Sequence, residues 1–124
     1  MADSLPAVLS RIQVAGNAEL VAAASTEGFL IDAARRDDVA LDAEEFAAVA
    51  VNGVMVAQAL GREISRGAMA GAFFEYEQGT VIVSVLDDEV ALVILAGKET
   101  NLGRLRLITR RYRDDVVQAA RAAV

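Results

Sequence analysis

The sequence contains no cysteine and no histidine, and these two absences exclude whole classes of functional site. Without cysteine, the chain forms no disulfide and offers no thiolate for catalysis or metal binding. Without histidine, it has no imidazole for a Ser-His or Cys-His catalytic pair or for a zinc site. We therefore expect no enzymatic activity, no catalytic residue, no bound metal and no cofactor.

The remaining patterns that resemble chemical motifs are incomplete. Residues 97–99 resemble the end of a phosphate-binding loop, but Leu92 stands where that motif requires its first glycine, and Glu99 replaces the hydroxyl residue that holds magnesium. The acidic segments 37–38 and 87–89 lack the spacing of a calcium loop and are more simply interpreted as solvated turns. A small-molecule sensor or enzyme stays open only as a third hypothesis, because no polar cluster is evident to line a pocket.

Charge is unevenly distributed along the chain. The 124 residues carry 12 basic and 18 acidic side chains, and the net charge of −6 argues against general nucleic-acid binding. Residues 1–97 hold five basic and fifteen acidic groups, for −10, whereas residues 98–124 hold seven and three, for +4. The basic end is either a solvated helix face or a docking surface for an acidic partner. The candidate partner-binding residues are Arg62, Glu63, Arg104, Arg110, Arg111 and Arg113.

Length and the absence of targeting signals set further expectations. A chain of this length predicts a single domain over residues 1–124. Asp3 precedes any apolar run and no basic segment opens the chain, so we expect no secretory signal peptide. The most apolar stretch, residues 46–60, is shorter than the about 20 apolar residues that span a bilayer. We therefore expect a soluble cytoplasmic protein with no membrane span.

Capping residues and turn residues predict the first half of the element order. Ser4 and Pro6 are typical of the start of a short helix, which ends near Gly16. Residues 18–25 and 29–34 have strand character and surround a turn, which predicts a β-hairpin.

The second half contains two helices and three strands. Asp42 is predicted to cap a long helix that runs to about Ser65. Strands are predicted over residues 68–77, 80–86 and 89–96, followed by a helix over 100–122. The buried stripe of that helix is predicted to contain Leu102, Leu105, Thr109, Tyr112, Val116 and Ala120. The fold class is therefore α+β, in the order α-β-β-α-β-β-β-α, with a five-stranded antiparallel sheet flanked by helices.

The long helix is apolar almost all the way round, because residues 46–60 contain only two polar side chains, Asn52 and Gln58. One face is predicted to cover the sheet, and its residues are Phe46, Val49, Ala50, Gly53, Ala57, Leu60 and Ile64. The other face is predicted to bury itself against a second copy of the chain, and its residues are Ala47, Ala48, Val51, Val54, Met55 and Gln58. The alternative is a monomer in which the first and last helices wrap over that face.

The element order and three stretches resemble the roadblock / dynein light-chain family, and within it the bacterial gliding-protein (Mgl-type) GTPase regulators. The stretches are LVAAASTEGFLIDAA at 20–34, FAAVAVNGVMVAQALGREI at 46–64 and ALVILAGKETNLGRLRLITRR at 91–111. The most specific phrase is Asn101-Leu102-Gly103 at the start of the last helix. The hairpin turn departs from the family pattern, since Thr-Glu-Gly replaces the commoner Asp-Gly.

The resemblance implies a homodimer in which the long helices pack across a two-fold axis and the third strands pair edge to edge into a ten-stranded sheet. That edge would lie within residues 67–77 and include Ala72, Phe73, Phe74 and Glu75. The resemblance also implies a Ras-like small GTPase as partner, with this chain as a non-enzymatic regulator or activating partner. The alternative is a scaffolding dimer that binds partners without altering GTP turnover.

Overall fold

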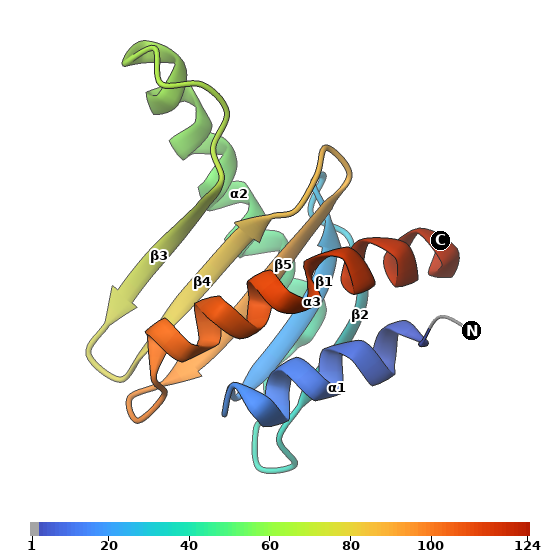
Figure 1. The fold of residues 1–124 in the computed structure, drawn as a ribbon. Coiled ribbons are helices and arrows are strands. Elements are labelled where there is room, and N and C mark those ends of the chain that lie inside the picture. The colour runs from blue at the N-terminus through green and yellow to red at the C-terminus, as the bar shows by residue number, and fades with distance from the viewer. Residues whose placement is uncertain (1–2) are drawn as a thin grey trace.

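A computed structural model describes residues 3–124, which form three layers (Figure 1). Two helices lie side by side on one face of a five-stranded antiparallel sheet, and one helix covers the other face. In chain order the elements are α1 (Leu5–Ala15), β1 (Leu20–Ser25), β2 (Leu30–Arg35), α2 (Ala43–Glu63), β3 (Gly71–Tyr76), β4 (Gly79–Val85), β5 (Val90–Gly97) and α3 (Leu102–Ala123). The predicted α+β order and the five-stranded sheet are confirmed.

The sheet order is β2-β1-β5-β4-β3, so β2 and β3 are its edges. Every neighbouring pair is antiparallel. The central strands β1 and β5 are buried along most of their length, which explains why they are almost purely apolar. Within residues 3–124, β3 pairs with β4 alone, so its outer backbone groups face away from the sheet with no strand partner.

The predicted helix caps are present. Ser4 Oγ accepts a hydrogen bond from a backbone N–H in the first turn of α1, and Asp42 Oδ1 does the same for two N–H groups of α2. Asn101 Oδ1 caps α3 at 3.0 Å. In the β1–β2 turn Gly28 has a φ of +100°, a conformation that glycine adopts without strain.

The core between the sheet and the α1–α3 layer is built from large side chains. Leu9 and Ile12 of α1 meet Leu105 and Val116 of α3 in one buried cluster with the inward residues of β1 and β5. The predicted stripe of α3 is confirmed in this cluster. Leu105, Thr109, Val116 and Ala120 are buried, and Leu102 and Tyr112 are half-buried.

The core between the sheet and α2 contains many small side chains. Ala43, Ala47 and Ala50 of α2 share a buried cluster with Ala22 and Ala24 of β1. Because alanine adds only one methyl group on each side, the helix backbone can lie close to the strands. The larger residues of α2 in this cluster are two valines near the middle of the helix.

By length and composition, α2 is the one helix within residues 3–124 that could cross a membrane. It has 21 residues and therefore extends beyond the apolar stretch seen in the sequence. Its buried residues pack on the sheet, which accounts for the apolar character of that face within the fold.

The start of α1 and the end of α3 lie at the same end of the molecule (Figure 1). That end is on the β2 side of the sheet, and β3 lies on the opposite side.

Asp87 ties the β4–β5 turn to the last turn of α3. Its carboxylate accepts the backbone N–H groups of Glu89 and Val90, each at 2.8 Å, and the guanidinium of Arg121 at 2.7 Å. Burial raises the pKa of Asp87, but these donors outweigh burial and hold that pKa below its ordinary value. Folding therefore favours the ionised form. The resulting stabilisation is present above the unfolded-state pKa and is lost as the pH falls through the folded-state pKa.

We expect Asp87→Ala to lower the free energy of unfolding by about 1–3 kcal/mol near neutral pH, because two backbone donors lose their acceptor. The difference from the wild type should begin to shrink below about pH 4, the ordinary pKa of an unfolded-state Asp, and should be lost as the pH falls through the lower folded-state pKa. Urea unfolding at several pH values measures both effects. Asp88→Ala is the control, since it removes the same charge from an exposed neighbour. A wild-type advantage over Asp87→Ala that does not change with pH would contradict this account.

Candidate functional site

A stripe of exposed apolar side chains runs along the outer side of α2. Val49, Val56, Leu60 and Ile64 are each more than half exposed. Their spacing of seven, four and four residues places them on one side of the helix. We call these four residues the α2 stripe. A contiguous apolar surface of this kind is typical of a protein-binding site.

Several residues of α2 lie on the opposite face from the one predicted. Ala47, Val51 and Val54 were predicted to meet a second chain, but they are buried against the sheet of their own chain. Val49 and Leu60 were predicted to cover the sheet, but they are exposed. The physical reason is the small-residue surface of β1, which accepts the alanine-rich side of the helix and turns the bulky side outward.

The other residues predicted to face the sheet have mixed positions. Ala50 is buried, and Phe46, Gly53 and Ala57 are half-buried at the boundary between the two faces. Ile64, the cap residue after α2, is exposed.

The remaining helical residues predicted for the interface lie away from the α2 stripe. Ala48 is beside the β1–β2 turn, where a Cβ on Gly28 would lie 3.7 Å from its Cα. Met55 and Gln58 line a hollow of about 570 Å³ that α2 forms with β4 and β5 on its opposite flank. Ala48 and Gln58 are half-buried and Met55 is 53% exposed, so an interface at these three positions stays a prediction, and its premise of a second apolar face on α2 holds.

A groove of about 480 Å³ separates the α2 stripe from the edge strand β3. Phe46, Val49 and Gly53 of α2 line one side, and Phe74 and Tyr76 of β3 line the other. A Cβ on Gly53 would lie 3.5 Å from the Phe74 ring, so the ring packs directly against the helix backbone. The groove is apolar and continues from the helix to the open strand edge.

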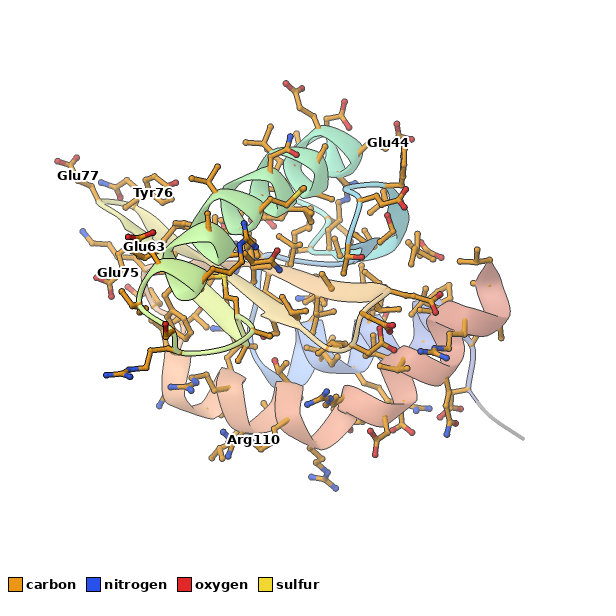
Figure 2. All side chains as sticks on the ribbon, turned by 90° about the horizontal axis from the view of Figure 1, so that it is seen from above. Glu44, Glu63, Glu75, Tyr76, Glu77 and Arg110 are labelled. Atoms are coloured by element: carbon orange, nitrogen blue, oxygen red, sulfur yellow. The ribbon has the colours of Figure 1, made fainter. Side chains whose placement is uncertain are left out.

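The predicted residues of β3 divide between the two faces of the sheet. Ala72 and Phe74 pack towards α2. Phe73 and Glu75 alternate with them and therefore face the α3 side. Glu75 and Tyr76 stand with Glu77 at the end of β3 (Figure 2). All of these residues belong to the edge strand, as predicted.

The arginines of α3 also divide between two sides of the helix. Arg106, Arg110 and Arg113 line a hollow of about 430 Å³ against β3 and β4. Arg110 forms its outer rim, since its side chain points away from the sheet (Figure 2). Arg104 and Arg111 do not line this hollow. The predicted basic flank of α3 is therefore not one continuous surface.

Arg104 and Arg111, which lie outside this hollow, make contacts within their own surroundings. Arg104 Nε donates to the Ala15 carbonyl oxygen at 3.3 Å, and the Arg111 guanidinium carbon lies 5.9 Å from the centroid of the Tyr112 ring. Arg106 was not among the predicted residues, and its guanidinium carbon is 5.5 Å from the centroid of the Phe73 ring. Its four-residue spacing from Arg110 was the available signal.

Arg62 and Glu63 occupy the last turn of α2, where both are exposed. A positive charge at this position is favoured by the helix dipole, which gives Arg62 a structural role as well as a candidate binding role. Within the described residues, no group of three or more acidic side chains could hold a metal ion. The features of this molecule that suggest function are surfaces for other proteins.

No protein-family model and no curated protein matches this sequence. Solved structures match closely in fold. MglB from Myxococcus xanthus is 22% identical, with 97% of this chain and 90% of that chain covered and a TM-score of 0.84. A structure described as MglB with tetrameric arrangement is 16% identical, with 97% and 90% covered and a TM-score of 0.87. A Roadblock/LC7 domain from Streptomyces avermitilis is 16% identical, with 93% and 99% covered and a TM-score of 0.75. The chain therefore has the roadblock fold, which confirms the fold that the resemblance implied.

The positions of Val51 and Val56 on opposite faces of α2 predict opposite effects of substitution at these two valines. Val51→Asp places an unpaired charge in the core and should destabilise the fold by more than about 3 kcal/mol. Val56→Asp places the same charge on the exposed side and should keep the native far-UV circular dichroism spectrum and a cooperative unfolding transition. Thermal melts of both variants measure this contrast. Loss of structure in Val56→Asp but not in Val51→Asp would restore the original assignment of the faces.

Proposed function

We propose that this chain is a non-enzymatic homodimeric regulator, or activating partner, of a Ras-like small GTPase. The observation that carries the proposal is the α2 stripe beside the unpaired edge of β3. The roadblock fold supports it, because the sequence resemblance to Mgl-type regulators implies both the dimer and the GTPase. A scaffolding dimer that leaves GTP turnover unchanged is the alternative function.

In a dimer with its two-fold axis beside β3, the α2 stripe and the open edge of β3 would both be buried in the same interface. If the axis passes beside β3, the outer N–H and C=O groups of two β3 strands pair with each other and extend the sheet. Both α2 helices then lie on the same face of the extended sheet. The apolar groove between α2 and β3 opens towards the axis, so the second copy's α2 stripe can enter it.

The free energy available from this contact is of the right size for a stable dimer. Val49, Val56 and Leu60 are 64%, 76% and 61% exposed. Burying such side chains completely gives about 1.5–3 kcal/mol each, so the six in a dimer, about two thirds exposed, contribute roughly 6–12 kcal/mol. Association costs about 4–15 kcal/mol. Each hydrogen bond between the two β3 edges adds about 0.5–1.5 kcal/mol.

The proposed GTPase contact lies at the solvent ends of the paired α2 helices. Arg62 and Glu63 are exposed there and lie next to the α2 stripe. The chain supplies no thiol and no imidazole, so an activating role would act by positioning the GTPase's own loops rather than by adding a reacting group. This proposal places the protein in the cytoplasm with its partner.

We expect the double variant Val56→Asp/Leu60→Asp to be a folded monomer, because four carboxylates would face one another across the two-fold axis. Sedimentation velocity measures the mass of the wild type and the variant at matched concentrations. The wild type should sediment as a dimer or a multiple of a dimer.

Leu107→Asp is the matched control for this experiment. Leu107 is 65% exposed on α3 and far from the groove, so its replacement introduces the same chemistry elsewhere. It should leave the mass unchanged. A wild type that sediments as a well-folded monomer, or a Leu107→Asp variant that dissociates while the double variant does not, would refute the placement of the interface.

The regulatory role predicts binding to a small GTPase and a change in its hydrolysis rate. Single-turnover GTP hydrolysis by a Ras-like GTPase encoded near this gene should accelerate when the wild type is added, and the double variant should give less acceleration. Arg62→Glu should weaken binding without changing the dimer mass. Binding with no change in turnover would identify the scaffolding alternative. The absence of any GTPase interaction, with an intact dimer, would remove the GTPase from the proposal.

A further inference from the structure

A trough lies on the face of the sheet opposite α2. Here α3 stands beside the outer strands β3 and β4 and leaves part of their surface uncovered, with a volume of about 430 Å³. The floor is apolar, because Phe73 of β3 pairs with Ile82 of β4 and remains 41% exposed. One wall is basic. We call this surface the arginine trough, and it is defined by Phe73, Ile82, Arg106, Arg110 and Arg113.

Within residues 3–124, the guanidinium groups of the arginine trough have no carboxylate partner. The ion pairs within residues 3–124 involve Arg11, Arg36 and Arg121. Arg113 donates to the carbonyl oxygen of Leu86, and Arg106 lies over the Phe73 ring. In a chain with a net charge of −6, three arginines around one apolar floor are thus left without a neutralising side chain.

We propose that the arginine trough binds an acidic segment of a partner protein that carries an apolar anchor residue. Guanidinium groups pair with carboxylates in a planar, two-point geometry that suits Asp and Glu side chains. The apolar anchor covers the exposed part of Phe73, next to the buried Ile82. One acidic segment with an apolar anchor therefore complements both the positive charge and the apolar floor of the arginine trough.

The chemistry of the chain favours an acidic protein segment over nucleic acid or an anionic membrane. The 18 acidic residues give the whole molecule a negative charge, which repels a long polyanion even where a small basic patch exists. Glu75 adds a carboxylate on the same face of β3, two residues from Phe73. A short peptide avoids this repulsion because it carries only as many carboxylates as the arginines can pair.

The arginine trough shares the strand β3 with the proposed dimer, but it uses none of the residues of the α2 stripe. It is formed within one chain and lies on the opposite face of the sheet from the α2 stripe. The inference therefore goes beyond the proposed GTPase regulation, and it can be tested separately from it.

Fluorescence anisotropy with a defined probe tests the inference. The probe is a fluorescein-labelled peptide of repeated Glu-Leu-Glu units, and the charge-reversed probe repeats Lys-Leu-Lys. Arg106→Glu should weaken binding of the acidic peptide about tenfold or more, because it replaces a charge-assisted contact with repulsion. Affinity for the acidic peptide should also fall as the salt concentration rises.

Arg111→Glu is the matched control, because Arg111 is also exposed on α3 and also lies over an aromatic ring, but outside the arginine trough. It should change the affinity no more than about twofold. Phe73→Thr keeps a strand-forming residue and removes the apolar floor, so it should weaken binding several-fold. If Arg106→Glu does not fold, Arg106→Gln tests the same contact without charge reversal and should also weaken binding.

Four results would overturn the proposal. They are no binding of the acidic peptide, equal losses in Arg106→Glu and Arg111→Glu, equal affinity for the Lys-Leu-Lys peptide, and tighter binding of oligouridine RNA or phosphatidylserine vesicles than of the acidic peptide. Each can be observed with the wild-type sedimentation mass unchanged, so failure here is distinguishable from failure of the dimer.

Discussion

The close approach of α2 to the sheet is the constraint on which the rest of this structure depends. It requires small side chains on both sides of the contact, and Ala47 and Ala50 of the helix meet Ala22 and Ala24 of β1 in one cluster. With Ala43, Ala47 and Ala50 buried in this contact, Val49, Val56 and Leu60 of the same helix are left on the outside. The α2 stripe and the groove beside β3 follow from that distribution. An apolar outer face is therefore a consequence of how the inner face packs.

The element order could be predicted from the sequence because its signals are local. Ser4 and Asp42, the two predicted caps, act through contacts within a few residues, and Gly28 adopts the positive φ of its turn. The orientation of α2 could not be predicted in the same way. The periodicity of the sequence shows two apolar faces on α2. Which of them is buried depends on the size of the β1 side chains beneath the helix, and these come from a distant part of the sequence. The division of the α3 arginines between two sides of the helix could not be predicted either, because it depends on which strands the helix crosses in the tertiary structure.

The shared fold sets the scaffold, and the side chains set what it does. Each of these structures has a similar backbone but is only 16–22% identical to this chain, so most positions differ between it and this chain. Val56, Leu60 and Arg106 contribute little to the core of this chain, yet they determine which surfaces are apolar or basic. The sheet keeps these surfaces on opposite faces. The α2 stripe and the arginine trough therefore have no residue in common.

The start of α1 and the end of α3 lie together on the β2 side, away from β3. A polypeptide attached at either point grows outward and leaves the open strand edge free. Affinity tags or fluorescent proteins fused at these ends would therefore not obstruct the proposed pairing of two β3 strands. A covalently linked tandem of two copies would be harder to build, because its linker would have to reach around the full width of both sheets.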